Sequence, residues 1–251
     1  MATPSSEHVL RWRLYARTPQ YRKHLDWARE AINKAAATAQ FMVSWSTGKD
    51  STAMAHLVHS MYPETPIVTQ YDDCDWPSKR AYADRIEQAM GWKAHRVEPS
   101  FSVWERMRMG RIGLDEFCAL THSLTQDAFL APLAKIQRKL GCDGVYMGLR
   151  AEESKARRAN LSKRHEVYKT LGGEWRCCPL ARWTADDVFA YHIEHGIEIN
   201  PCYFNNRFLK PEEIRVSWAV PTPGARAHGE MEHFRYYYPE QFRKLRDMEI
   251  Y

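Results

Sequence analysis

Short apolar runs alternate with helix-forming segments through the middle of this chain, and that alternation restricts its fold more than any other feature. The runs expected to form strands cover residues 40–46, 66–71, 93–97 and 144–149, and helices are expected over residues 51–58 and 77–90. Strands that alternate with helices favour a parallel sheet, because right-handed crossover helices then cover both of its faces. We therefore predict an α/β fold with a twisted parallel sheet and with ligands beyond the carboxyl ends of its strands.

Helical segments flank the predicted sheet on both sides in the sequence. Before it, Leu25, Ala28 and Ile32 recur at the spacing of one helix face. After it, a loop containing Pro and Gly at residues 221–224 precedes a helical, aromatic and charged stretch. We expect one domain with N- and C-terminal helical extensions: an extension over residues 1–39, the α/β domain over residues 40–204 and a tail over residues 205–251.

A further helix is expected after residue 184. Thr184 is the predicted N-cap, and Asp187 stands three residues later, where its carboxylate can bind back to the Thr184 amide. The sequence therefore predicts an acidic variant of the capping box at this point.

The composition is that of a globular protein, with 44% apolar and 27% charged residues among 251. The formal net charge of +5 suits phosphate-bearing ligands but is too small to indicate a dedicated nucleic-acid-binding domain. No apolar stretch approaches the roughly 20 residues of a membrane span, and the N-terminal segment lacks the apolar core of a signal peptide. We expect a cytoplasmic protein with no membrane partner and with reduced thiols, since none of its six cysteines forms a CxxC pair.

The segment between the first predicted strand and helix combines the groups that bind an anion. It reads Ser46-Thr47-Gly48-Lys49-Asp50-Ser51. The unpaired amides and the dipole of the following helix favour negative charge, Gly48 permits close approach of the backbone, and Lys49 adds a positive charge. A phosphate or pyrophosphate is the expected ligand, although a polar helix N-cap without a ligand could have the same residues.

Two common phosphate-binding motifs do not match this segment. Asp50 follows Gly-Lys where the P-loop of kinase-like NTPases has Ser or Thr, and Val43 stands where that motif has its first Gly. The GxGxxG pattern of dinucleotide-binding folds is also absent from it.

The segment instead resembles the PP-loop family, whose motif reads Ser-Gly-Gly-x-Asp-Ser after the first strand. Thr47 replaces the first Gly of that motif, and it leaves less room beside the phosphates. The preceding Ser44-Trp45 is similar to the Ser-Phe of the phosphoadenylyl-sulfate (PAPS) reductase branch. The resemblance implies a Rossmann-like fold of the PP-loop type.

Three later segments strengthen the resemblance to the PAPS reductase branch. Residues 148–158 are similar to its Gly-x-Arg-x-x-Glu-Ser-x-x-Arg pattern, residues 178–189 to its Pro-Leu-x-x-Trp-x-x-x-Asp-Val-Trp pattern, and residues 200–203 to its Asn-Pro-Leu-Tyr. The order of these segments is that of the family, and the resemblance spans roughly residues 40–203.

The resemblance implies an adenosine nucleotide, ATP or PAPS, with its phosphates on the loop and with Mg²⁺ as an expected cofactor. Lys49 is the candidate electrostatic contact, Ser51 the candidate hydroxyl donor, and Asp50 the residue that organises the loop or holds the metal. Asp72 and Asp73, just after the second predicted strand, are candidates for contact with ribose, adenine or Mg²⁺, although acidic turn residues are equally common. No other metal ligand is assigned.

Further nucleotide contacts are expected along both segments. They are Ser44, Ser46, Thr47, Gly48, Gly148, Arg150, Glu153, Ser154, Arg157 and Arg158. We expect the three arginines to face the loop and to form the second wall of the site, because arginine binds oxyanions in a bidentate manner. A solvated charged face is the alternative for these arginines.

The chain departs from the thiol-dependent PAPS reductases at its C-terminal end. Those enzymes carry a catalytic cysteine in a Glu-Cys-Gly-x-His motif, whereas no cysteine follows Cys202 here. Cys177-Cys178 resembles the cysteine pair of the iron–sulfur adenylyl-sulfate reductases, but their later CxxC pair is missing, so an iron–sulfur cluster is not expected. We interpret His192 and His195 as packing or surface residues rather than metal ligands.

These features predict an ATP pyrophosphatase-type enzyme that adenylates an acceptor and releases pyrophosphate. The acceptor is not specified; the basic charge and the aromatic tail leave a nucleic acid open, and a homo-oligomer is open as well. One alternative is a PAPS reductase or a sulfotransferase-like enzyme acting on PAPS. A second is a non-catalytic subunit that binds a nucleotide or a nucleic acid without releasing pyrophosphate.

Overall fold

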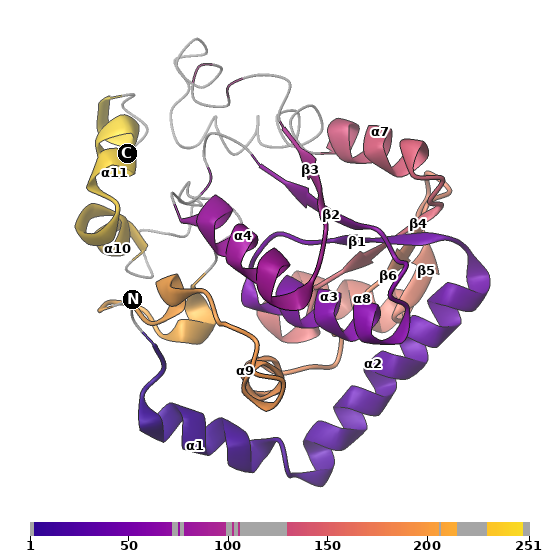
Figure 1. Ribbon diagram of the computed structural model, residues 1–251, viewed down its shortest axis with the longest axis horizontal. Coiled ribbons are helices and arrows are strands. Elements are labelled where there is room, and N and C mark those ends of the chain that lie inside the picture. Colours follow the sequence, from indigo (N-terminus) through magenta and orange to yellow (C-terminus); the bar gives the residue numbers. More distant parts are fainter. Residues whose placement is uncertain are drawn as a thin grey trace.

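The computed structural model describes residues 3–71, 75, 78–98, 102, 105, 130–205, 207–214 and 230–247. Asp72 and Asp73 lie outside these residues, as do the loop at residues 221–224 and much of the segment between the third and fourth strands. Figure 1 shows a central sheet with helices packed around it. In the part of the chain that the structure describes, no helix is long and apolar enough to cross a membrane.

The sheet contains six strands among the described residues, and its order is β3-β2-β1-β4-β6-β5. The strands are β1 (Phe41–Ser44), β2 (Ile67–Gln70), β3 (His95–Val97), β4 (Gly144–Met147), β5 (Val167–Lys169) and β6 (Trp175–Cys177). All neighbouring pairs are parallel except β5 and β6, which are antiparallel. The predicted parallel sheet is therefore confirmed, with one antiparallel strand added at its edge.

Strand β1 lies in the middle of the sheet because its residues are apolar on both faces. Val43 pairs with Ile67 of β2 on one side and with Tyr146 of β4 on the other. Met42 and Val43 are both fully buried, although they belong to opposite faces, since Met42 packs in a separate apolar cluster. A strand buried on both faces has a continuous apolar run, which is the signal that the sequence gives here.

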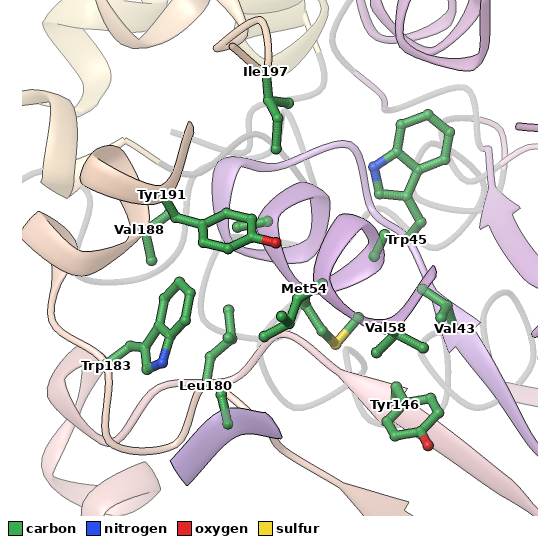
Figure 2. Close-up of a cluster of buried hydrophobic side chains, with 14 of the residues drawn as sticks. Val43, Trp45, Met54, Val58, Tyr146, Leu180, Trp183, Val188, Tyr191 and Ile197 are labelled. Carbon is green, nitrogen blue, oxygen red and sulfur yellow. The ribbon is translucent and has the colours of Figure 1, made fainter. Parts of the chain in front are cut away.

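Helices cover both faces of the sheet, as the alternating pattern predicted. On the face of Val43 lie α2 (Pro19–Thr38), α3 (Lys49–Met61), α4 (Lys79–Met90) and α9 (Ala185–Glu194), which contribute to the largest apolar cluster. Figure 2 shows part of that cluster, where side chains of α3 lie between those of α9 on one side and those of β1 and β4 on the other. On the face of Met42, α7 (Ala131–Lys139) packs against Val145, and α8 (Lys155–Arg164) contributes Leu161 to a third cluster.

The N-terminal segment forms two helices where the sequence analysis found one. Helix α1 (Ser6–Tyr15) ends before Thr18, whose hydroxyl caps α2 by accepting a hydrogen bond from the Tyr21 amide. Pro19 occupies the first helical position of α2, where its missing amide costs nothing. Leu25, Ala28 and Ile32, which marked the predicted face, are all buried.

The capping box before α9 is confirmed, and it is also a junction with the N-terminal helices. The Thr184 hydroxyl accepts from the Asp187 amide at 3.2 Å, and the Asp187 carboxylate accepts from the Thr184 amide at 2.6 Å. The same carboxylate binds His24 Nδ1 at 2.8 Å and accepts from Tyr15 Oη at 3.1 Å. A buried carboxylate with this many partners fixes α1 and α2 to the start of α9.

The C-terminal region forms α10 (Glu230–Tyr237) and α11 (Pro239–Asp247), which pack on each other. Tyr238 and Phe242 are partly buried against the main apolar cluster, so this tail packs on the domain. Two short 3₁₀ helices, Pro201–Tyr203 and Pro211–Glu213, connect α9 to the region before α10.

Candidate functional site

The candidate site lies at the carboxyl ends of β1 and β4, which are neighbours in the sheet. From β1 the chain crosses over through α3 to β2 on one side, whereas β4 and β6 lie on the other side. A crevice opens where the connections on neighbouring strands diverge, and ligands of open α/β sheets bind there. The structure has a cavity of about 1040 Å³ at this position, lined by residues of the predicted loop and of the segment after β4.

The loop between β1 and α3 takes its shape from Thr47, whose backbone is left-handed. Its φ angle is +63°, a region that glycine enters freely and that β-branched residues avoid. The Thr47 side chain is only 1% exposed, and its hydroxyl has no hydrogen-bond partner among the described residues. The position therefore suits the glycine of the PP-loop motif, and Thr47 points into the protein instead of lining the cavity.

Ser46 and Ser51 close the loop through their hydroxyl groups. The Ser46 amide donates to Ser51 Oγ at 3.2 Å, and the two Oγ atoms are 3.0 Å apart. Ser51 Oγ also donates to the Gly48 carbonyl oxygen at 3.1 Å. Both serines line the cavity, so the groups that hold the loop are also available to a ligand.

The N-terminus of α3 is directed toward the cavity without a side-chain cap. Gly48 is the N-cap residue, and it can provide no side-chain hydrogen bond to the first amides of the helix. The Lys49 amide donates to Tyr203 Oη at 3.0 Å, whereas Asp50 and Ser51 follow as the next residues of the first turn. An uncapped helix start with its dipole favours an anionic ligand.

A carboxylate flanked by two cations forms the floor of the cavity. Asp50 binds Lys49 Nζ at 2.9 Å and Arg150 Nε at 2.5 Å, and the side chains of both cations are 3% exposed. Burial by itself would raise the pKa of Asp50, but the charges and hydrogen bonds of Lys49 and Arg150 outweigh burial and lower it. Asp50 therefore stays ionised and holds two cations at the end of β1.

Aromatic rings and a histidine hold Lys49 from the other side. Its Nζ lies 5.1 Å from the ring centroid of Tyr203 and 5.8 Å from that of Phe189, which are cation–π distances. His192 Nε2 lies 2.8 Å from the Lys49 carbonyl oxygen, and since burial lowers the pKa of His192, this nitrogen is the donor of a neutral ring. His192 is thus a buried packing residue, as interpreted from the sequence.

Gly148, at the end of β4, lets the two halves of the site approach each other. A Cβ atom at this position would lie 2.9 Å from the Cα and the amide nitrogen of Ser51 and 3.1 Å from the carbonyl carbon of Asp50. Contacts this short to backbone atoms cannot be relieved by a side-chain rotation. Gly148 was predicted as a nucleotide contact. A glycine is also required at this position because β4 packs closely against the loop.

The arginine-rich segment after β4 contributes two of its three arginines. Arg150 binds Asp50 and, at 2.5 Å, the Glu152 carboxylate, while Arg157 pairs with Glu153. Arg158 is exposed and does not line the cavity. The structure therefore does not bring Arg158 to the expected second wall, because successive residues of a helix point about 100° apart.

The structure places the other predicted residues as follows. Ser44, Ser46, Gly48, Lys49, Asp50, Ser51, Gly148, Arg150, Glu153 and Arg157 line the cavity. Ser154 does not line it but caps α8, its hydroxyl accepting from the Arg157 amide at 3.1 Å. Asp72 and Asp73 lie outside the described residues.

Several lining residues were not among the sequence candidates. They are Arg11, Tyr15, Met147, Leu149, Glu152, Thr184, Ala185, Asp186, Phe189, Tyr203, Leu209, Glu212, Glu213 and Ile214. Tyr203 belongs to residues 200–203, which resemble the Asn-Pro-Leu-Tyr of the family, so the sequence did contain a signal that could have placed it at the site. No sequence signal pointed to Arg11 and Tyr15, because they belong to α1, which is far from every motif in the sequence.

The cysteines that the structure describes are buried and free. They are Cys142, Cys177, Cys178 and Cys202. Burial raises the pKa of the Cys178 thiol to about 12 and also raises the pKa values of the Cys177 and Cys202 thiols. In this environment the three thiols are protonated at neutral pH. No group of three or more potential metal ligands occurs among the described residues.

Comparisons with known proteins agree with this geometry. The family model of the phosphoadenosine phosphosulfate reductase domain matches residues 40–243, which extends past the motifs into the C-terminal helices. A phosphoadenosine 5'-phosphosulfate reductase of Proteus mirabilis is 24% identical over 166 residues, which are 65% of this chain and 65% of that protein. Sulfate adenylyltransferase subunit 2 of Shewanella pealeana is 26% identical over 185 residues, which are 65% of this chain and 60% of that protein. The chain thus spans just under two thirds of the length of these relatives.

Solved structures share the fold at low sequence identity. The phosphoadenylyl-sulfate reductase of Candida auris has a TM-score of 0.51 at 16% identity, covering 79% of this chain and 90% of that one. The U34-tRNA thiolase NcsA of Methanococcus maripaludis has a TM-score of 0.53 at 14% identity, covering 91% of this chain and 78% of that one. With the loop at the end of β1, the cavity beside it and the family match over residues 40–243, this chain belongs to the phosphoadenosine phosphosulfate reductase domain family, a branch of the PP-loop superfamily.

Proposed function

We propose that the protein is an ATP pyrophosphatase-type enzyme that transfers the adenylyl group of ATP to an acceptor. The observation that carries this proposal is the set of residues that line the cavity. The start of α3 and the Lys49–Asp50–Arg150 cluster line it, whereas none of its described lining residues is a cysteine. The described residues of the cavity are therefore suited to bind a nucleotide, and they include no thiol for attack on sulfur.

In the proposed reaction, an oxygen of the acceptor attacks the α-phosphorus of ATP. A new acceptor O–P bond forms, the bond from the α-phosphorus to the oxygen that bridges it to the β-phosphorus breaks, and pyrophosphate leaves with that electron pair. Lys49, Arg150 and the amides at the start of α3 are suited to stabilise the charge that builds on the leaving group. Ser46 and Ser51 line the same part of the cavity, and their hydroxyls can donate to the same oxygens once they leave their present partners within the loop.

The charge of the cavity supports a nucleotide that carries a metal ion. Its described lining includes six carboxylates, Asp50, Glu152, Glu153, Asp186, Glu212 and Glu213, and four cations, Arg11, Lys49, Arg150 and Arg157. Each of the four cations is paired with a carboxylate. A bare triphosphate would enter a cavity with surplus negative charge, and this repulsion is removed when a divalent cation accompanies it.

The residues present fit Mg²⁺ that arrives on the phosphates, not a resident metal. Magnesium bound to nucleotides keeps several waters and takes only one or two protein carboxylates. Asp50 is one candidate, once a phosphate draws Lys49 or Arg150 away from it, and Glu152 beside Arg150 is another. When bound, the ion would neutralise charge on the phosphates and on the leaving pyrophosphate.

A PAPS-dependent activity is the second candidate, and the family match favours it. The matching family and the Proteus mirabilis relative are both named for phosphoadenosine phosphosulfate reductase. Against a reductase stands the described lining of the cavity, which includes no cysteine to act as the nucleophile on sulfur.

Titration of the purified protein with ATP and with PAPS, each with and without Mg²⁺, tests the proposal. We expect ATP with Mg²⁺ to bind in the micromolar range typical of enzyme substrates, about 8 kcal/mol, and PAPS to bind more weakly. Pyrophosphate release should require an acceptor, and sulfite should not form from PAPS and thioredoxin. Sulfite production that is lost in a Lys49→Ala variant would overturn the proposal and place the protein among the reductases.

A further inference from the structure

Helix α1 forms part of the candidate site, although it lies outside the matched residues 40–243. It packs on α9, which in turn packs on α3, so the N-terminal segment reaches the loop through one intervening helix (Figure 1). Arg11 and Tyr15 of α1 line the cavity together with Asp186 of α9. These two helices supply a wall of the cavity that is separate from the phosphate-binding loop.

Trp12 fixes this wall in place. It is 2% exposed, and its ring stacks on Phe189 with centroids 4.4 Å apart and an interplanar angle of 18°. Phe189 is also one of the two rings that flank Lys49. The indole nitrogen of Trp12 donates to Asp186 Oδ1 at 3.1 Å. A continuous set of contacts therefore runs from α1 to the lysine of the loop.

Arg11 is the side chain of this wall that can exchange its partner. It pairs with Asp186, and the two side chains are 56% and 39% exposed. An ion pair this open is weak, because solvent screens it and it holds a long side chain in one geometry. Asp186 stays where it is through its bond to the buried Trp12 indole, so Arg11 is the partner free to bind another oxyanion.

We propose that Arg11 recognises the acceptor and that the acceptor is a small molecule carrying an oxyanion, a carboxylate or a phosphate. This inference rests on the proposed adenylyl transfer. The guanidinium fork of Arg11 matches either oxyanion. A nucleic acid is disfavoured, because its many phosphates would meet Glu152, Asp186, Glu212 and Glu213, which also line the cavity, whereas a single oxyanion needs only the Arg11 guanidinium.

Non-reactive mimics of an acyl adenylate provide the probes. They are N-acylsulfamoyl adenosines whose acyl chain ends in a methyl, a carboxylate, a phosphonate or an ammonium group, each prepared in a short version of succinyl length and a long version of adipoyl length. Their dissociation constants are measured on the full chain, on Arg11→Ala and on Arg13→Ala, an exposed arginine of the same helix that does not line the cavity. ATP with Mg²⁺ is titrated against each protein in parallel.

At one of the two chain lengths, an oxyanion-ended probe should bind the parent protein about tenfold more tightly than its methyl-ended partner, as expected for a hydrogen-bonded charge. That advantage should disappear in Arg11→Ala and persist in Arg13→Ala, with the affinity for ATP unchanged in both. The carboxylate and phosphonate arms tell the two oxyanions apart.

Three results would overturn the inference. They are equal binding of oxyanion- and methyl-ended probes at both lengths, an oxyanion advantage that survives Arg11→Ala, and tighter binding of the ammonium-ended probe than of either oxyanion. In the last case the α1–α9 wall would bind a cation through the Asp186 carboxylate. If ATP with Mg²⁺ itself failed to bind the parent protein, the proposed adenylyl transfer would fall, which is a separate outcome from loss of the oxyanion preference.

Discussion

At the scale of single residues, Asp50 decides how the cations of the site are held. The Asp50 carboxylate, whose side chain is 15% exposed, lies between Lys49 and Arg150 and keeps both of them at the end of β1 in the free protein. Among the described residues, Asp50 and Glu152 occupy only some of the donors of these two cations, and a phosphate can bind the others. The sequence analysis gave Asp50 the choice of organising the loop or holding a metal, and its contacts in the free protein agree with the first role.

We expect Lys49→Ala to weaken the binding of ATP with Mg²⁺ by about 1.5–3 kcal/mol, the range for a hydrogen bond to a charged group. The substitution also leaves Asp50 with Arg150 as its remaining cation, so part of the loss comes from a reorganised loop. Calorimetric titration measures the effect, and Lys34→Ala, on the exposed side of α2, is the control. Equal affinities of Lys49→Ala and the parent would remove Lys49 from the phosphate site.

Thr47 is the residue at which this loop is most strained. A β-branched residue in the left-handed region costs roughly 1–2 kcal/mol, and its buried hydroxyl has no partner among the described residues. Thr47→Gly removes both costs but adds backbone freedom to the unfolded chain and loses a buried methyl group.

On this balance, Thr47→Gly should raise the free energy of unfolding by about 1 kcal/mol. Urea denaturation of the ligand-free protein measures it. Thr47→Ser keeps both the strained backbone and the hydroxyl, so it should not share the gain. A Thr47→Gly variant that is less stable than the parent would show that the Thr47 side chain has a favourable partner.

At the scale of elements, the site depends on how closely β4 approaches the start of α3. Gly148→Ala would place a Cβ atom 2.9 Å from the Ser51 backbone. We expect this change to lower the free energy of unfolding by about 1–3 kcal/mol, as overpacking does, and to weaken nucleotide binding as well. Gly172→Ala is the matched control, because a Cβ there would meet only the Thr170 hydroxyl at 3.7 Å. If Gly148→Ala and Gly172→Ala changed the free energy of unfolding equally, the close approach of β4 to the start of α3 would be contradicted.

The packing of α3 against α9 makes the stability of the protein depend on pH. His56 of α3 bonds Tyr191 Oη of α9 at 2.8 Å, and the His195 ring lies 5.1 Å away. Burial, followed by the neighbouring histidines His195, His192 and His59, lowers the pKa of His56 to about 4. The unfolded chain takes up a proton at its ordinary pKa of about 6.5, before the folded protein does.

The contribution of His56 is therefore present above about pH 6.5 and is lost as the pH falls toward 4. Denaturation curves at a series of pH values in this window should show falling stability, and His56→Gln, which keeps a hydrogen-bonding group for Tyr191, should reduce the slope. An unchanged slope in His56→Gln would show that other groups set the acid sensitivity.

At the scale of the whole molecule, the net charge and the charge of the site have opposite signs. The chain carries a formal charge of +5, whereas the described lining of the cavity has two more carboxylates than cations. The overall charge therefore attracts anions toward the surface, but the cavity admits a polyanion only when its charge is offset.

Removal of Mg²⁺ should accordingly weaken ATP binding by at least about tenfold, and adenosine binding should change little. Titration in the presence of a chelator, followed by addition of excess Mg²⁺, measures both effects. Equal ATP affinity with and without Mg²⁺ would show that the cavity offsets the triphosphate charge with its own residues.

The sequence alone determined the sheet, its parallel core and the position of the loop, because these follow from local patterns. An apolar run, a turn of small polar residues and a helix start are adjacent in the chain, and the motif at residues 148–158 marks the second edge of the site. The short strands β5 and β6, of three residues each, were not predicted from the sequence.

Only the tertiary structure decided which groups surround the ligand. Of the adjacent Arg157 and Arg158, helix geometry turns one toward the cavity and the other to solvent. Arg11 reaches the site from α1 because Trp12 stacks on Phe189, a contact between residues 177 positions apart that has no local pattern. Local patterns record what a residue's neighbours in the chain require, whereas the walls of this cavity are set by the packing of elements that are distant in the chain.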